Sequence, residues 1–342
     1  MKLSEFDFKL PPELIARFPA ERRGDSRLLY LRRDGGRVSH HRFAELPDLL
    51  AAGDFLVMNN SRVISARLMG RVDGRTAEML IVSDLGGNRL EALCRPAARF
   101  GIGAEFVADG GPRGVVMEAV GRGRRRLRFD RDYERVLEHG YAPLPPYIKR
   151  RADEAAARRG FDLERYQTVY ARDPGSIAAP TAGLHFNPEI LARLRERHPL
   201  LEITLAVGEA TFQTIAAEEI EEHRMGRERI RIPAAAARRI AGLKGEGRAL
   251  LAVGTTTVRS LETYARLDAG AQREEFFSEI FITPGFRFRL VDKLLTNFHL
   301  PKSSLFILAS AFAGLEPLRE AYQIAIAEKY RFFSYGDAML IA

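Results

Sequence analysis

The chain has 342 residues, of which 46% are hydrophobic and 29% are charged, as is ordinary for a folded globular protein. This composition excludes a disordered chain. The longest apolar stretch, Leu305 to Leu315, is too short to cross a bilayer, and the first residues contain no apolar segment typical of a signal peptide. We therefore expect a soluble, cytoplasmic protein without a membrane partner. Cys94 is the only cysteine, which excludes an intramolecular disulfide and a cysteine zinc cluster.

The formal net charge is +8 and the isoelectric point is about 9.7. Such a charge favours a polyanionic partner, because lysine and arginine gain affinity by releasing counterions from phosphates. An arginine-rich composition inherited from a GC-rich genome is the alternative explanation, and the charge alone does not separate the two.

The length predicts either two domains or one large domain with an insertion. Residues 64–131 differ from the rest of the chain, since they contain short alternating strand patterns separated by Gly-Gly turns. We predict a small antiparallel β-barrel there, inserted as residues 64–146. The stiff segment Pro143 to Tyr147 marks its exit. Residues 1–63 and 147–342 are then a discontinuous α/β domain, so the predicted fold class is a mixed α/β domain interrupted by a β-barrel.

The remaining residues alternate between strand and helix patterns. Asn187 followed by a proline predicts a helix from about 188 to 198. Pro233 opens an alanine-rich helix that ends near Gly245, and residues 249–253 read as a buried strand. An apolar helix is expected from Ser303 or Ser304, followed by an amphipathic helix over about 316–329.

Polar residues occur in four segments where a hydrophobic core does not need them. In residues 166–186, Asp173 to Ser176 reads as a turn, and Thr181 and Gly183 lead to His185 just before a helix. Backbone N–H groups and hydroxyls that converge there suit an anionic or very polar ligand, although each residue alone also fits an ordinary loop or cap.

The second segment follows the buried strand 249–253 and contains Thr255, Thr256 and Arg259. The carboxyl end of a strand is where open α/β sheets bind ligands, and a guanidinium holds a carboxylate or a phosphate well. In the alternative interpretation, the threonines cap a helix and Arg259 pairs with Glu262 one turn later.

In the third segment, Asn297 and His299 precede the apolar helix. A lone histidine is usually structural, but His185 and His299 each lie in a polar loop beside a helix start, and imidazole moves protons near neutral pH. The C-terminal tail adds Tyr335 and Asp337 in an aromatic-rich stretch, where stacking on a base is one option.

The run from Arg122 to Arg131 is the densest basic segment and fits a strand with one solvated arginine face, which is also suited to tracking an RNA backbone. The chain has no GxGxxG, no P-loop and no paired His or Cys spacing. Classical Rossmann methyltransferases, NTPases and zinc enzymes therefore lack support.

Long ordered motifs over essentially the whole chain resemble the S-adenosylmethionine:tRNA ribosyltransferase-isomerase family of queuosine biosynthesis. They are GDFLVMNNSRVISARL (53–68), PLPPYIKR (143–150), YQTVYARDPGSIAAPTAGLHF (166–186), VGTTTVRSLE (253–262), TNFHLPKSSLFILASAFAG (296–314) and YRFFSYGDAMLI (330–341). The resemblance implies a monomeric enzyme with an α/β domain interrupted by a β-barrel. It also implies S-adenosylmethionine as the ribosyl donor and tRNA carrying 7-aminomethyl-7-deazaguanine in the anticodon as the acceptor. The implied products are epoxyqueuosine in tRNA, adenine and methionine, with no permanently bound cofactor and no metal.

Such a reaction needs proton transfer and a holder for the methionine carboxylate. On the resemblance we assign His185, His299 and Glu279 as catalytic residues and Arg259 to the carboxylate. The substrate-binding set assigned with it is Thr181, Gly183, Thr255, Thr256, Arg259, Asn297, Tyr335 and Asp337.

Two places depart from the family pattern. Glu209 and Ala210 stand in a segment that is usually Gly-Leu-Gly-Thr-Phe, and Gly226 stands where a histidine usually follows a methionine. Loss of a glycine strains a turn that needs positive φ. The alternative function is therefore a divergent relative that binds tRNA without this chemistry, or an enzyme with a different acceptor.

Overall fold

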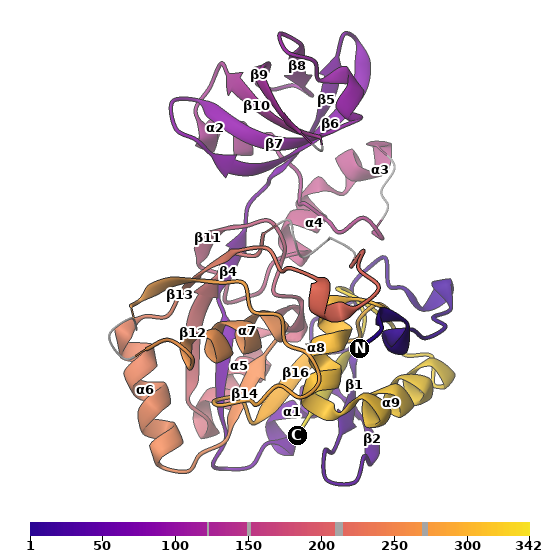
Figure 1. Ribbon diagram of the computed structural model, residues 1–342, viewed down its shortest axis with the longest axis vertical. Coiled ribbons are helices and arrows are strands. Elements are labelled where there is room, and N and C mark those ends of the chain that lie inside the picture. Colours follow the sequence, from indigo (N-terminus) through magenta and orange to yellow (C-terminus); the bar gives the residue numbers. More distant parts are fainter. Residues whose placement is uncertain (122, 149–151, 209–214, 269–272) are drawn as a thin grey trace.

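The computed structural model describes residues 1–121, 123–148, 152–208, 215–268 and 273–342 (Figure 1). One part is a large sheet with helices packed against it, and a closed antiparallel β-barrel stands apart at one end of the long axis. The predicted fold class, an α/β domain interrupted by a small β-barrel, is confirmed. The exact domain boundaries at residues 64 and 146 stay predictions.

The large sheet has the strand order β15–β13–β12–β3–β14–β16–β17–β1–β2. Strands β12, β3, β14 and β16 are parallel, whereas β17 is antiparallel to β16. The chain therefore leaves β3, β14 and β16 at the same edge, which is where a ligand site is expected. The strand bounds are β1 Arg27–Leu31, β2 Val38–Arg42, β3 Phe55–Asn59, β12 Leu200–Leu205, β13 Glu228–Arg231, β14 Leu250–Val253, β15 Glu275–Ser278, β16 Lys293–Asn297 and β17 Ala338–Ile341.

Hydrophobic cores lie on both faces of this sheet, as strand β3 illustrates. Phe55 and Val57 contact one core, with α6, α7, α8 and α9, while Leu56 and Met58 contact the other, with α1 and α5. This alternation follows from the two-residue repeat of a strand. The helices are α1 Leu46–Leu49, α5 Pro188–Arg197, α6 Ala234–Gly245, α7 Thr255–Tyr264, α8 Ser304–Ala313 and α9 Leu315–Ala327. Within the described ranges, no helix is both long and apolar enough to span a bilayer.

The barrel closes in the order β10–β7–β6–β5–β8–β9, and its core includes Leu68, Phe106 and Leu127. Its bounds are β5 Arg67–Val72, β6 Arg75–Asp84, β7 Arg89–Arg95, β8 Glu105–Ala108, β9 Arg113–Gly121 and β10 Arg124–Phe129. Strand β10 is the predicted basic strand, but its arginine face is partly buried: Arg124 and Arg126 form ion pairs with Glu91. These two arginines thus help to hold the barrel wall together.

Short elements connect the two parts. In Figure 1, α3 (Ala152–Ala157) and α4 (Arg159–Arg165) lie between the sheet and the barrel. Further short elements occur elsewhere along the chain. They are α2 Tyr133–Leu137, β4 Ser61–Val63, β11 Asp173–Ser176 and the 3-10 helices Leu3–Phe6, Pro12–Leu14, Phe43–Glu45, Ala97–Arg99, Thr181–His185 and Ile220–Glu222.

The helices predicted from sequence are confirmed as α5, α6, α8 and α9. Asn187 caps α5 by accepting a hydrogen bond of 2.8 Å from the Ile190 N–H, and Ser303 caps α8 by accepting one of 3.2 Å from Phe306.

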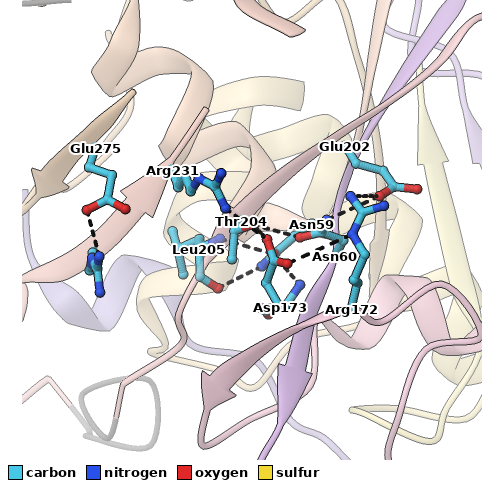
Figure 2. A network of polar contacts seen from close by, with 11 residues as sticks. Asn59, Asn60, Arg172, Asp173, Glu202, Thr204, Leu205, Arg231 and Glu275 are labelled. Carbon is cyan, nitrogen blue, oxygen red and sulfur yellow. Dashed lines mark hydrogen bonds and ion pairs between the residues drawn. The ribbon is translucent and has the colours of Figure 1, made fainter. Parts of the chain in front are cut away.

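The turn predicted over Asp173 to Ser176 is wrong, because this segment is strand β11, which pairs in parallel with β4. Tertiary contacts override its Pro-Gly signal. Figure 2 shows the network that holds it: Thr204 Oγ1 lies 2.7 Å from both Asn60 Oδ1 and Asp173 Oδ2. Asp173 also pairs with Arg231 of β13 at 3.8 Å.

Candidate active site

A cavity of about 130 Å³ lies where the chain leaves the parallel strands β14 and β16. Segments far apart in the sequence line it, including the start of the 3-10 helix 181–185, the first turns of α7 and the loop before α8. Its polar lining contains six of the predicted site residues: Thr181, Thr255, Thr256, Arg259, Asn297 and His299. The fold thus brings together most of the substrate-binding set and one of the predicted histidines.

Thr255 and Thr256 reach the cavity because α7 begins directly after the end of β14. Gly254 makes this tight connection at a φ of 89°, a conformation that favours glycine. The Asn59 amide, at the end of neighbouring strand β3, donates to Thr256 Oγ1 over 3.4 Å. Because Asn59 Oδ1 accepts from the N–H groups of Ser61 and Leu205, each at 3.0 Å, its amide orientation is fixed.

Arg259 extends from α7 into the cavity wall and is only 5% exposed. Its Nη1 donates to Glu228 Oε2, and its Nε donates to the Ile280 carbonyl at 3.3 Å. Its Nη2 is buried without a hydrogen-bond partner among the described residues. The alternative pairing with Glu262 is wrong, since Glu262 instead binds Arg266 and the backbone N–H groups of Arg289, Leu290 and Val291.

Asn297 ends β16 and is 2% exposed. Its Nδ2 donates to the Phe333 carbonyl at 3.0 Å and lies 3.1 Å from His185 Nε2. His185 itself does not line the larger cavity. It lies beside a second, smaller cavity of about 20 Å³ and contacts the active-site region through Asn297.

His299 lines the cavity directly and is 7% exposed. Its Nε2 lies 2.8 Å from Thr296 Oγ1, and its backbone N–H donates to the Tyr322 hydroxyl at 2.9 Å. Burial lowers the pKa of His299 to about 3, so the imidazole is neutral at neutral pH. Among the predicted catalytic residues, His299 has the most direct access to a ligand.

Besides His185, four predicted residues lie outside this cavity. Gly183 packs against Tyr170 and Thr168, and Asp337 accepts backbone hydrogen bonds. Tyr335 lines the smaller cavity, and Glu279 is exposed just after β15. The roles assigned to these residues stay predictions.

Sequence reasoning missed the groups that hold the predicted site residues in place, namely Ser26, Asn59 and Glu228. The Asn59-Asn60 pair directly after the apolar strand β3 was a signal for one of them, since polar residues at a strand end favour a site. Ser26 and Glu228 carried no local signal, because their partners lie far away in the sequence.

The description "Queuosine biosynthesis protein" belongs to the family model that matches residues 3–341. The chain belongs to this family. The S-adenosylmethionine:tRNA ribosyltransferase-isomerase of Desulfitobacterium hafniense is 46% identical to it and that of Moorella thermoacetica 45%, each over the full length of both chains. The crystal structure of an S-adenosylmethionine tRNA ribosyltransferase from Thermotoga maritima is also similar, with a TM-score of 0.56 and 36% identity, over 99% of this chain and 100% of that one.

Membership in the queuosine biosynthesis family makes this chain an enzyme of the ribosyltransferase-isomerase type and confirms the resemblance seen in the sequence. Of the positions that depart from the family pattern, Glu209 and Ala210 lie outside the described residues. Gly226 precedes Glu228, the partner of Arg259, by two residues. In the described part of the chain, no group of three or more His, Cys, Asp or Glu side chains is arranged to hold a metal.

Proposed function

We propose that the enzyme transfers and isomerises the ribosyl group of S-adenosylmethionine onto 7-aminomethyl-7-deazaguanine at the wobble position of tRNA. The products are epoxyqueuosine in tRNA, adenine and methionine. The names of the relatives support the two substrates. The observation that carries the proposal is that Arg259, Asn297 and His299, from separate segments, line one cavity at the ends of the parallel strands.

The donor is proposed to bind through its methionine carboxylate and its ribose. Arg259 lines the cavity, and its Nη2 is a donor without a described partner, while Glu228 and the Ile280 carbonyl hold the rest of the guanidinium in place. A guanidinium fixed in this way suits a carboxylate. The hydroxyls of Thr181, Thr255 and Thr256 are suited to the ribose hydroxyls.

The reaction begins when the sulfonium acidifies the adjacent ribose methylene, so that loss of a proton gives an ylide. Adenine leaves as the ring opens and rearranges, the aminomethyl nitrogen captures the sugar, and methionine is expelled as the epoxide closes. A proton must therefore be removed from the methylene and another delivered to adenine. We assign this exchange to His299, because its neutral imidazole lines the cavity and can accept a proton there.

The acceptor is a polyanion, whose negative charge is complementary to the net charge of +8 on the protein. A cytoplasmic location and a monomeric state complete the proposal, as is expected for an enzyme that acts on tRNA and S-adenosylmethionine.

The test is mass spectrometry of nucleosides and small molecules after the protein is incubated with S-adenosylmethionine and tRNA carrying 7-aminomethyl-7-deazaguanine. Epoxyqueuosine, adenine and methionine are expected in equal amounts. His299→Ala is expected to abolish turnover while its unfolding transition stays cooperative, and tRNA with guanine at the wobble position serves as the substrate control. Binding of tRNA without any of the three products would instead support a divergent relative or a different acceptor.

A further inference from the structure

The amide of Asn297 has one orientation in this fold. Its two N–H bonds point at the Phe333 carbonyl, 3.0 Å away, and at His185 Nε2, 3.1 Å away. A flipped amide would set Asn297 Oδ1 against the carbonyl oxygen, and two acceptors repel each other. Oδ1 is consequently left as the group that faces away from these partners. It is buried and has no hydrogen-bond partner among the described residues.

The Phe333 carbonyl is itself held in position. Phe333 has a φ of 74°, which is rare for a bulky residue and persists where the surroundings impose it. The Gly336 N–H donates to the same carbonyl at 2.9 Å, closing a tight turn. This acceptor therefore stays where the Asn297 amide needs it.

The orientation of Asn297 determines the tautomer of His185. Since Nδ2 of Asn297 donates to Nε2, this ring nitrogen carries no proton, and Nδ1 is the protonated one. Nδ1 lies 2.7 Å from Ser26 Oγ and donates to it. Phe43 packs against the imidazole with ring centres 5.0 Å apart. Both nitrogens of His185 are thus occupied within the protein, and neither is available to a ligand.

The surroundings of His185 keep it neutral. Burial lowers its pKa to about 3, and the positive charges of Arg331 and Arg23 contribute to the same shift. Protonation of Nε2 would replace the acceptor with a donor and break the contact with Asn297. The electrostatics and the hydrogen bonds therefore favour the same state of the ring.

We infer that His185 is a positioning residue, which fixes the Asn297 amide so that Oδ1 is presented to the cavity as an acceptor for an N–H or O–H donor of the co-substrate. The identity of that co-substrate, S-adenosylmethionine, rests on the proposed function. His185 then acts through Asn297 and not by transferring a proton to the reactants. Oδ1 complements the hydrogen-bond donors of the cavity: Thr256 and Arg259 donate hydrogen bonds, whereas Oδ1 accepts one.

The first test is independent of turnover. In protein labelled with ¹⁵N-histidine, the His185 signals, assigned by their loss in His185→Gln, are expected to show a neutral ring protonated at Nδ1 from pH 8 down to pH 5. An Nε2–H tautomer, or protonation near the ordinary histidine value of about 6.5, would overturn the inference. This result stands even if the proposed reaction is not observed.

The second test compares two replacements of His185. The side-chain oxygen of His185→Gln can take the place of Nε2 and accept from Asn297, whereas His185→Leu offers no acceptor; neither can transfer a proton. With S-adenosylhomocysteine as the probe in calorimetry, His185→Leu is expected to bind about tenfold more weakly than His185→Gln, as loss of one well-made hydrogen bond implies. Equal weakening in both variants would overturn the inference.

Turnover gives a separate readout once the wild-type reaction has been observed. His185→Gln is expected to keep the shape of the wild-type pH profile of kcat/KM and to exceed His185→Leu by about tenfold. A profile that loses one ionisation in His185→Gln would assign proton transfer to His185 instead. Should His185→Leu fail to fold, Asn297→Asp replaces it, because a carboxylate cannot donate to Phe333 and His185. Probe binding by Asn297→Asp equal to that of the wild type would then contradict the inference.

The probe also identifies the donor group on the ligand. Binding is measured for S-inosylhomocysteine, which lacks the exocyclic amine, and for the 2′-deoxy and 3′-deoxy forms of S-adenosylhomocysteine. The analogue that lacks the group bound by Oδ1 is expected to lose about tenfold in the wild type and little further in His185→Leu. If all three analogues lose the same additional factor in His185→Leu, Oδ1 receives none of these donors.

Discussion

The guanidinium of Arg259 and the carboxylate of Glu228 form an ion pair in which both side chains are almost fully buried, at 6% and 2% exposure. It joins helix α7 to strand β13. A buried pair of this kind contributes little net free energy, because both charges lose their hydration, but loss of one partner leaves the other charge uncompensated. The ion pair therefore fixes the Arg259 side chain in the cavity wall.

Glu228→Ala should reduce the free energy of unfolding by about 3–5 kcal/mol, since Arg259 is left as an unpaired buried charge. Glu228→Gln keeps an acceptor and should cost less. Urea denaturation measures both. The matched control is Glu275→Ala, which removes the exposed partner of Arg229 on the neighbouring strand and should cost less than about 1 kcal/mol. Equal losses at positions 228 and 275 would contradict the burial argument.

The buried neutral histidines predict a loss of stability in mild acid. Burial lowers the pKa of both His185 and His299 to about 3, against about 6.5 in the unfolded chain. Between these values the unfolded chain binds more protons, so stability is fully present above pH 6.5 and falls as the pH decreases. Each histidine should cost about 2 kcal/mol between pH 6.5 and pH 5.

Urea unfolding of the wild type and of His299→Gln at these two pH values checks this dependence. The variant should lose about 2 kcal/mol less than the wild type on acidification. His41→Gln, a change on the outer strand β2, should leave the wild-type difference in place. The same pH dependence in His299→Gln as in the wild type would show that His299 is not buried in its neutral form.

Local patterns in the sequence predicted what lies within one strand, turn and helix. The apolar strand β14 followed by threonines predicted Thr255, Thr256 and Arg259 as site residues, because ligands bind at the carboxyl ends of the strands in open α/β sheets, and all three line the cavity. The partner of Arg259 was not predictable, since Glu228 lies on a strand 31 residues away and sequence spacing offered Glu262 as the only nearby alternative partner. Pairing across the sheet is decided by tertiary packing, which leaves no periodic signal.

The motif 166–186 shows that even a local sequence pattern does not tell which of its residues face the cavity. Thr181 and Gly183 are two residues apart, yet only Thr181 lines the cavity, because the 3-10 helix turns Gly183 toward Tyr170. Asp337 was likewise assigned to the site from its place in a specific motif, whereas its carboxylate binds the backbone. The motifs therefore indicated which residues are important, but they did not separate residues suited to ligand contact from residues that pack or hold the backbone.

Gly183→Ala should destabilise the fold without removing a ligand contact. A Cβ at Gly183 would lie 2.1 Å from the Tyr170 hydroxyl oxygen and 2.7 Å from Thr168 Cγ2, so the buried neighbours must move. Overpacking of this kind costs about 1–3 kcal/mol. Gly160→Ala in α4, where no heavy atom lies within 4 Å of the new Cβ, is the control and should be neutral or slightly stabilising.

Thermal and urea unfolding compare these two glycine variants directly. If Gly183→Ala unfolds like the wild type but binds S-adenosylhomocysteine more weakly, Gly183 contacts the ligand as the sequence predicted, and the packing argument is wrong.

Asp337 is expected to act on stability and not on substrate binding. Its Oδ1 accepts from the Arg27 N–H at 2.9 Å and its Oδ2 from the Arg331 N–H at 2.8 Å, which joins the start of β1 to the start of β17. Hydrogen bonds to a charged group contribute about 1.5–3 kcal/mol each, so Asp337→Ala should lose about 3 kcal/mol or more in urea unfolding. At a temperature where the variant is folded, its KM for S-adenosylmethionine should stay close to that of the wild type. Asp132→Ala removes the exposed cap of α2 in the barrel and should cost only about 1 kcal/mol, which makes it the matched control. A stable Asp337→Ala with a raised KM would return Asp337 to the substrate-binding set.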